Sequence, residues 1–315
     1  MLRMDGFTYT RARSWEEALA RWDADAMYVA GGTDLLPNLK HRIVRPKRLI
    51  GLDIPGSIVE EGDTVVIGAG TRLDAIAARA SLGPLATAAG LVAGPQIRAM
   101  GTLGGNVLLD TRCLYYNQTE PWRKALGYCL KAEGTWCHVV GGPKTCVAAQ
   151  SSDTVPVLLA LDATLSFLGP SGRRALRIRD LYRFNGMDHL QIEKGELLTE
   201  IVLPKPGAGF RGSYQKLRTR DSIDFPQLGL AIVGTFDGAV PSALEIVVGA
   251  ANPQPKPVRG LDAFLGAPLD TAAIEAVADL VYKQTRPQAA VYGDVAWRRQ
   301  MATVFTRRGL SVLVG

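Results

Sequence analysis

Histidine is scarce in this chain, which has only His41, His138 and His189 among 315 residues. That scarcity argues against a hydrolase built on several histidine metal ligands. Long apolar runs are also missing: the longest, Val155 to Leu168, is interrupted by Asp162 and is too short to cross a bilayer. The first residues carry no apolar segment of the signal-peptide type. The sequence therefore predicts a cytoplasmic protein with reduced thiols and no membrane contact.

Positive charge is only mildly in excess, with 36 Lys and Arg against 30 Asp and Glu, which gives a net charge of +6. No basic arm or zinc-finger pattern is present, which argues against a nucleic-acid partner. The chain is 47% hydrophobic and 21% charged, as a folded globular protein is, and its length predicts two domains. Glycine is abundant at 34 residues, which indicates tight turns or backbone that lies close to a ligand.

The order of predicted elements favours an α+β fold over a single doubly wound sheet. Helices and strands are mixed as far as residue 168. Strands are predicted at 212–217, 228–236 and 243–250, and helices at 271–286 and 293–313. Residues 101–152 show no periodicity, and an irregular segment of that length inside a domain is usually functional.

Two short motifs contain paired glycines whose successive N–H groups could hold a pyrophosphate. The first follows a predicted strand and the second opens the irregular segment; each is also compatible with a plain turn. Their residues are Ala30, Gly31, Gly32, Thr33, Asp34 and Leu35, and then Thr102, Leu103, Gly104, Gly105 and Asn106. A third stretch, Val65 to Gly70, resembles the start of a dinucleotide fingerprint, but Leu73 stands where its last glycine would fall. We interpret that stretch as a strand and a turn.

All four cysteines lie within 34 residues, in the pattern C-x15-C-x7-C-x8-C. They are Cys113, Cys129, Cys137 and Cys146. Structural zinc sites usually have paired C-x2-C spacing, which is missing here, whereas an iron–sulfur cluster can take thiolates from a long wrapping loop. The residues alone leave a cluster, a zinc site and unliganded thiols open.

Three further positions have plain structural explanations. Asp153 precedes a predicted helix and could be its cap. Lys216 stands near Arg218 and Arg220, as on a solvated strand face, and Leu198 reads as a core residue.

Five motifs together resemble the FAD-binding medium subunit of the molybdenum hydroxylase (xanthine oxidase-like) family. They are AGGTDLLPNLK from Ala30, TLGGN from Thr102, SDTVPVLLALDA from Ser152, ELLTEIVLP from Glu196 and YQKLRTRD from Tyr214. The resemblance implies that residues 30–35 and 102–106 hold the FAD pyrophosphate. It places Asp110 and Asp153 at two acidic positions, the latter near the ribose or adenine, Leu198 near the adenine or flavin, and Lys216 near the isoalloxazine ring.

The segment between the GGN and SDTVP motifs is longer than in most members of that family. It resembles the insertion of the 4-hydroxybenzoyl-CoA reductase β subunit, which carries an extra [4Fe–4S] cluster. The resemblance thus implies that Cys113, Cys129, Cys137 and Cys146 ligate a [4Fe–4S] cluster. It also implies electron flow from a ferredoxin-like donor through the cluster and FAD to a small [2Fe–2S] subunit and a molybdopterin-binding large subunit, in an (αβγ)2 heterohexamer.

The implied architecture is a PCMH-type FAD-binding domain at 1–175, with α+β subdomains at about 1–55 and 56–175 and the cluster loop at about 107–152. A C-terminal domain at 176–315, with a small antiparallel sheet and a helical bundle, would follow. No substrate-binding or catalytic residue is expected on this chain. Two alternatives remain: a related oxidase or dehydrogenase subunit with outward electron flow, and a four-thiolate zinc-binding scaffold.

Overall fold

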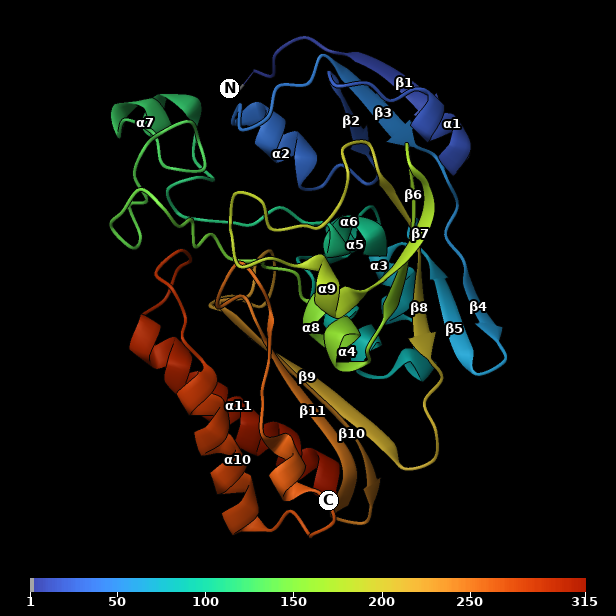
Figure 1. The fold of residues 1–315 in the computed structure, drawn as a ribbon, viewed down its shortest axis with the longest axis vertical. Coiled ribbons are helices and arrows are strands. Elements are labelled where there is room, and N and C mark those ends of the chain that lie inside the picture. The colour runs from blue at the N-terminus through green and yellow to red at the C-terminus, as the bar shows by residue number, and fades with distance from the viewer. Residues whose placement is uncertain (1–2) are drawn as a thin grey trace.

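The computed structural model describes residues 3–315, which form three β-sheets. The first is parallel, in the order β1-β3-β2, and lies at the top of Figure 1. Its elements are β1 (Thr8–Ala12), α1 (Trp15–Ala20), β2 (Ala26–Val29), α2 (Leu35–Lys40) and β3 (Arg48–Leu52). Helix α1 begins after Ser14, whose hydroxyl accepts a hydrogen bond from the Glu17 N–H at 3.1 Å.

The second sheet is antiparallel, in the order β4-β5-β8-β6-β7. Its strands are β4 (Ile58–Glu61), β5 (Thr64–Gly68), β6 (Thr164–Gly169), β7 (Gly172–Arg177) and β8 (Leu197–Pro204). It shares the largest hydrophobic core with four helices, α3 (Leu73–Ala77), α4 (Pro84–Gly90), α6 (Leu103–Val107) and α8 (Thr154–Ala160). Short helical turns complete this part: η1 (Ala80–Leu82), α5 (Pro95–Arg98), α7 (Glu120–Ala125) and α9 (Ile178–Leu181).

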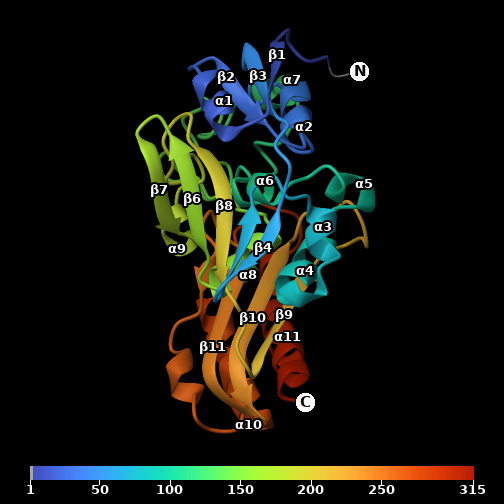
Figure 2. The same ribbon diagram turned by 90° about the vertical axis from the view of Figure 1, so that its right-hand side faces the viewer.

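The third sheet is antiparallel, in the order β12-β11-β10-β9. It comprises β9 (Phe210–Leu217), β10 (Leu228–Asp237), β11 (Val240–Gly249) and β12 (Lys256–Pro257), with η2 (Leu261–Phe264) beyond it. The helices α10 (Thr271–Gln284) and α11 (Val295–Val314) pack on it (Figures 1 and 2). Side chains of β10 alternate between two cores: Leu230 and Ile232 face these helices, whereas Ala231 and Val233 join the larger core.

The predicted α+β fold, with a small antiparallel sheet and helices at the C-terminal end, is confirmed. Strand β8 pairs with β5 and β6, so that sheet combines segments far apart in the chain. The proposed division at residue 175 stays a prediction. No helix within residues 3–315 is both long enough and apolar enough to cross a membrane.

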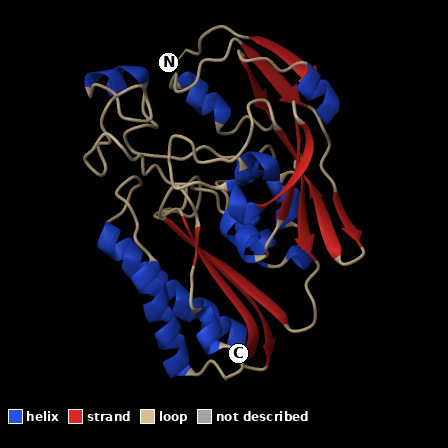
Figure 3. Ribbon diagram, viewed as in Figure 1, coloured by secondary structure: helices blue, strands red, loops and turns tan. Residues whose placement is uncertain are grey.

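Between α6 and α8 the chain is irregular apart from α7, and Figure 3 shows it as a long path of loops. We call residues 108–153 the cysteine loop. Its two ends meet where Arg112 and Ala149 exchange backbone hydrogen bonds of 2.8 Å. The Leu114 N–H donates to the Ala290 carbonyl at 2.8 Å, which ties the loop to the C-terminal part.

Candidate functional site

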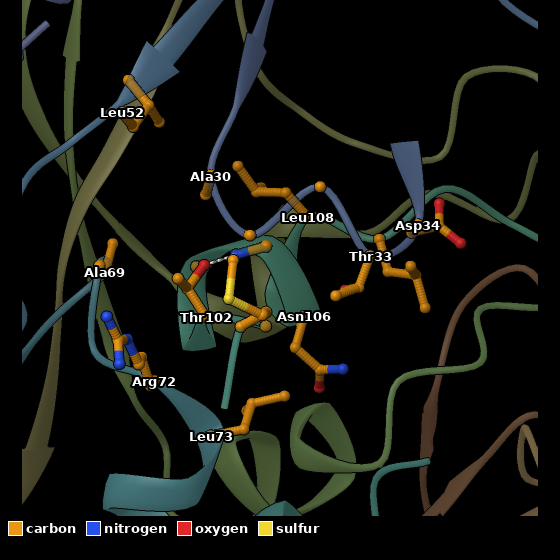
Figure 4. A pocket seen from close by; sticks show the side chains of 18 of the residues that line it. Ala30, Thr33, Asp34, Leu52, Ala69, Arg72, Leu73, Thr102, Asn106 and Leu108 are labelled. Carbon is orange, nitrogen blue, oxygen red and sulfur yellow. Dashed lines mark hydrogen bonds between the residues drawn. The ribbon is translucent and has the colours of Figure 1, made fainter. Parts of the chain in front are cut away.

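A cavity of about 1350 Å³ opens between the turns that follow β2 and β5 and the start of α6 (Figure 4). Every cofactor-binding residue predicted from the sequence lines it except Leu103 and Lys216. These residues are Ala30, Gly31, Gly32, Thr33, Asp34, Leu35, Thr102, Gly104, Gly105, Asn106, Asp110, Asp153 and Leu198. The structure therefore brings together segments from four separate parts of the sequence.

The turn after β2 leaves several backbone donors free. Among residues 3–315, no group accepts a hydrogen bond from the N–H of Gly32, Thr33 or Asp34. Gly32 has a φ of 69°, which glycine adopts without strain. A Cβ on Gly31 would lie 1.9 Å from the Met100 carbonyl oxygen, so this turn packs directly on the segment that precedes the second motif.

The second glycine motif forms the first turn of α6. The Thr102 hydroxyl accepts a hydrogen bond from the Gly105 N–H at 3.1 Å and caps the helix. Gly104 donates to the Ala69 carbonyl at 2.9 Å, and a Cβ on Gly104 would lie 2.8 Å from that of Ala69. The N–H groups of residues 103–106 all donate within the protein, so the expectation that this motif offers free donors is wrong. Both glycine turns face one cavity, where the first offers free N–H groups and the second lets a ligand approach the backbone closely, and together they form a cradle that suits a pyrophosphate.

Asn106 is oriented by the start of α8. Its Oδ1 accepts hydrogen bonds from the hydroxyls of Ser152 at 2.6 Å and Thr154 at 2.7 Å. Its amide nitrogen is left for the cavity, which Asn106 lines. This contact explains why the SDTVP segment accompanies the GGN motif.

Asp153 stands at the N-cap position of α8, as expected, but its side chain makes no capping hydrogen bond. Its two carboxylate oxygens accept hydrogen bonds from the Tyr214 hydroxyl at 2.8 Å and the Lys216 ammonium at 2.9 Å. Burial raises the pKa of the Asp153 carboxyl, and the charge of Lys216 opposes that rise. Its role toward ribose or adenine stays a prediction.

Lys216 is buried, with 1% of its side chain exposed, so the solvated-face explanation is wrong. Besides Asp153, its ammonium donates to the carbonyls of Leu91 at 2.9 Å and Asp224 at 2.8 Å. It therefore ties β9 to the end of α4 and to the β9–β10 connection, behind the cavity wall. Its predicted place near the isoalloxazine ring stays a prediction.

A second charged group borders the cavity near the cysteine loop. Arg112 donates to Asp34 at 2.8 Å and lies over the Phe225 ring, 3.9 Å from its centroid. Burial raises the pKa of the Asp34 carboxyl, whereas Arg112 opposes that rise. These contacts join the first glycine turn, the cysteine loop and the β9–β10 connection.

Sequence reasoning missed part of the cavity wall. The residues that it did not single out include Asp53 to Ser57, Ala69 to Arg72, and Ile223 to Phe225. Ala69 and Gly70 end the stretch that resembles a dinucleotide fingerprint, and we interpreted that stretch only as a strand and a turn. Its glycines were a usable signal for a ligand-facing turn.

The four cysteines are brought together. Cys113, Cys129, Cys137 and Cys146 are all buried, all free of disulfides, and all line one small cavity. Burial raises the pKa of the Cys113 thiol to about 11 and also raises that of Cys146. Four free thiols around one cavity are the donor set of an iron–sulfur cluster, so the residues present fit such a group.

Aromatic residues surround this second cavity. Tyr115 lies 5.2 Å from His138 and 6.3 Å from Trp122, measured between ring centroids. Arg123, 5% exposed, donates to the carbonyls of His41 and Arg42 at 3.0 Å and so fastens the loop to the end of α2. The cysteine loop is thus attached to the part of the fold that carries the first glycine turn.

Comparison with known proteins agrees with this geometry. The family model for the FAD binding domain in molybdopterin dehydrogenase matches residues 5–206. The model for the CO dehydrogenase flavoprotein C-terminal domain matches residues 212–313. The chain therefore belongs to the family of FAD-binding medium subunits of molybdenum hydroxylases.

Within that family, the chain is similar along almost its whole length to subunits of two kinds. It is 30% identical to the carbon monoxide dehydrogenase medium chain of Afipia carboxidovorans, covering 96% of this chain and 95% of that one. It is 32% identical to the aldehyde oxidoreductase FAD-binding subunit of Escherichia coli, covering 91% and 92%. A structure of carbon monoxide dehydrogenase from Hydrogenophaga pseudoflava matches with a TM-score of 0.77 and 28% identity, over 98% of this chain and 97% of that one.

Proposed function

We propose that this chain is the electron-transferring flavoprotein subunit of a molybdenum-dependent oxidase or dehydrogenase, with electrons flowing outward to an external acceptor. The observation that carries the proposal is the cradle made by the two glycine turns. The direction is supported by the relatives named above, which are a carbon monoxide dehydrogenase and an aldehyde oxidoreductase. The 4-hydroxybenzoyl-CoA reductase reading, with inward flow from a ferredoxin-like donor, has less support.

In this proposal the free N–H groups at 32–34 bind the pyrophosphate of FAD, and the glycines at the start of α6 let it approach the backbone closely. Asn106 contributes its amide and Asp110 an acidic group, Asp153 lies near the ribose or adenine of FAD, and Leu198 packs near the adenine or flavin. Lys216 fixes Asp153 and the connection that carries Phe225. When bound, the flavin can accept and release electrons singly or in pairs.

We further propose that Cys113, Cys129, Cys137 and Cys146 ligate a [4Fe–4S] cluster. Residues 3–315 contain no group of three or more His, Cys, Asp or Glu side chains arranged to hold a metal ion. Thiolates around a cluster stand further apart than the ligands of a single zinc, because iron and sulfide lie between them. What supports the cluster is that all four free thiols line one buried cavity, which is the number of thiolates that a [4Fe–4S] cluster needs.

The partners follow from what this chain would lack. With its four cysteines assigned, it has none left for a [2Fe–2S] centre. We propose a molybdopterin-binding large subunit, a small [2Fe–2S] subunit, a ferredoxin-like external redox partner and an (αβγ)2 assembly. Sedimentation of the natively purified protein should show one large complex, and an active monomer would contradict the assembly.

The direction is tested on the anaerobically purified complex. Carbon monoxide and an aromatic aldehyde are offered with an oxidised dye, and 4-hydroxybenzoyl-CoA is offered with a reduced one. We expect dye reduction with an oxidisable substrate and no consumption of the thioester. Consumption of the thioester, without oxidation of either other substrate, would restore the reductase reading.

A further inference from the structure

We propose that Lys131 tunes the reduction potential of the cluster, and that its ion pair with Asp110 links the two cavities electrostatically. The cysteine cavity is the small one lined by the four cysteines, and the FAD cleft is the large one lined by the two glycine turns. This inference rests on the proposed function, since it requires a cluster at the four cysteines. In this role Lys131 holds its positive charge at a fixed place beside the cluster.

Lys131 stands two residues after Cys129, one of the proposed cluster ligands. It lies between Cys129 and Cys137, lines the small cavity with all four cysteines, and has 6% of its side chain exposed. Among the described residues that line this cavity, the only other basic side chain is His138, which meets the Tyr128 carbonyl at 2.8 Å. The cavity therefore has one ammonium in its wall.

The position of that ammonium is fixed by several contacts. It donates to Asp110 Oδ1 at 2.6 Å, to the Thr111 hydroxyl at 2.5 Å and to the Thr111 carbonyl at 3.2 Å. It also lies 4.6 Å from the centroid of the Tyr116 ring. Thr111 is itself anchored, since its hydroxyl donates to the Gly186 carbonyl at 2.7 Å. A lysine held this way presents its charge at one place rather than sweeping through solvent.

Asp110 belongs to the other cavity. It lines the FAD cleft, stands three residues before Cys113, and is 40% exposed. The His189 ring lies 3.8 Å from the same carboxylate oxygen. A single ion pair thus reaches from the wall of the cleft to the wall of the cysteine cavity.

The physical effect has a definite sign. Reduction adds an electron to a centre that four thiolates already make negative, so a nearby positive charge stabilises the reduced form. Burial leaves this attraction less screened than it would be at the surface. The negative charge of Asp110 offsets part of the attraction between Lys131 and the reduced cluster. Removing the lysine charge should therefore lower the potential, whereas removing the aspartate charge should raise it.

The test is an anaerobic redox titration of the intact complex, with the cluster and the flavin followed by EPR and visible absorbance. In Lys131→Met the ratio of reduced to oxidised cluster at a fixed potential should fall about tenfold, or about 59 mV for a one-electron couple. Lys131→Arg should stay near wild type. Lys144→Met, which removes an exposed lysine of the same loop, should leave the potential unchanged.

The second variant in this titration is Asp110→Asn, in which the reduction potential of the cluster should rise instead of falling. A merely structural role would not produce opposite shifts from the two partners. Full iron content with an unchanged potential in Lys131→Met would overturn this inference and leave the cluster in place. If Lys131→Met loses iron, Asp110→Asn decides, and an unchanged potential there overturns the inference. Wild-type complex without the extra cluster signal would overturn the proposed [4Fe–4S] cluster, and this inference with it.

Discussion

The FAD cleft and the cysteine loop are neighbouring sites built in different ways. The cleft is made by turns that β2, β5 and α6 hold in place, with close backbone packing at Gly31 and Gly104. The cysteine loop has one short helix, and its own small core consists largely of the cysteines and their neighbours. We infer that the cleft is formed by the fold itself, whereas the loop depends on what joins its thiols.

The largest expected effect comes from removing one thiol, which should disrupt the cysteine loop and leave flavin bound in the cleft. Cys129→Ser should lose all of the iron proposed for this chain, since a hydroxyl is a poor substitute for a thiolate. Residues 113–146 should then become susceptible to protease. Ala132→Ser, at a buried position of the same small core, is the matched control and should keep its iron.

Flavin should stay bound in Cys129→Ser, with weaker affinity because the loop continues directly from the TLGGN motif. Limited proteolysis and flavin content are measured on the same preparation. Complete loss of flavin together with the iron would contradict the view that the cleft stands by itself.

The second effect concerns the buried ion pair behind the cleft. Lys216→Met leaves the Asp153 carboxylate without its cation, and breaking a buried pair in this way costs about 3–5 kcal/mol. Lys205→Met breaks a solvent-exposed surface pair with Glu60 of similar length, 2.7 Å, and should cost far less, because water screens that pair. Denaturant unfolding compares the two variants, and equal losses would refute the structural role of Lys216.

A smaller effect is expected from the glycine turn. Gly32→Val places a branched side chain at a φ of 69° beside Leu36, and flavin affinity should fall about tenfold while iron content stays unchanged. Gly62→Val introduces similar strain, at a φ of 56°, in the exposed β4–β5 turn. Equilibrium flavin binding should separate the two, and equal flavin loss in both variants would show that strain alone is responsible.

The smallest effect is a pH dependence beside the cleft. Burial raises the pKa of Glu196, but its hydrogen bonds with Arg174 outweigh this and hold the pKa below the usual 4.5. The pair therefore stabilises the fold above that pH and stops doing so as pH falls through the lowered pKa. The advantage of wild type over Glu196→Gln in thermal unfolding should be present near neutrality and shrink in acid. An advantage that grows in acid would contradict the assignment.

The sequence was most informative where backbone conformation has a residue signature. Paired glycines, one pair after a strand and one at the start of the irregular segment, predicted the two turns. The family motifs predicted which segments meet at the cleft. The burial of Lys216 could not be predicted, because a lysine near two arginines on a strand has the pattern of a solvated face. Only the fold reveals that Asp153, Leu91 and Asp224 enclose it.

The sequence indicated that the cysteines of this loop form a ligand set, but it did not predict the course of the loop. Its cysteine spacing indicated a ligand set, yet the segment has no hydrophobic period from which elements could be derived. Its course depends on long-range contacts such as Arg123 with the end of α2 and Leu114 with Ala290. The link from Lys131 to Asp110 spans 21 residues of irregular chain, and no local rule predicts it.

The central claim is that one chain holds FAD in the glycine-built cleft and a [4Fe–4S] cluster in the cysteine loop. The direct measurement is iron, sulfide, zinc and FAD content of the anaerobically purified complex, taken as the difference between wild type and Cys129→Ser. The account predicts a difference of about four irons and four sulfides per FAD, with no zinc. Zinc in place of iron, or no difference in metal content while FAD is fully bound, would contradict it.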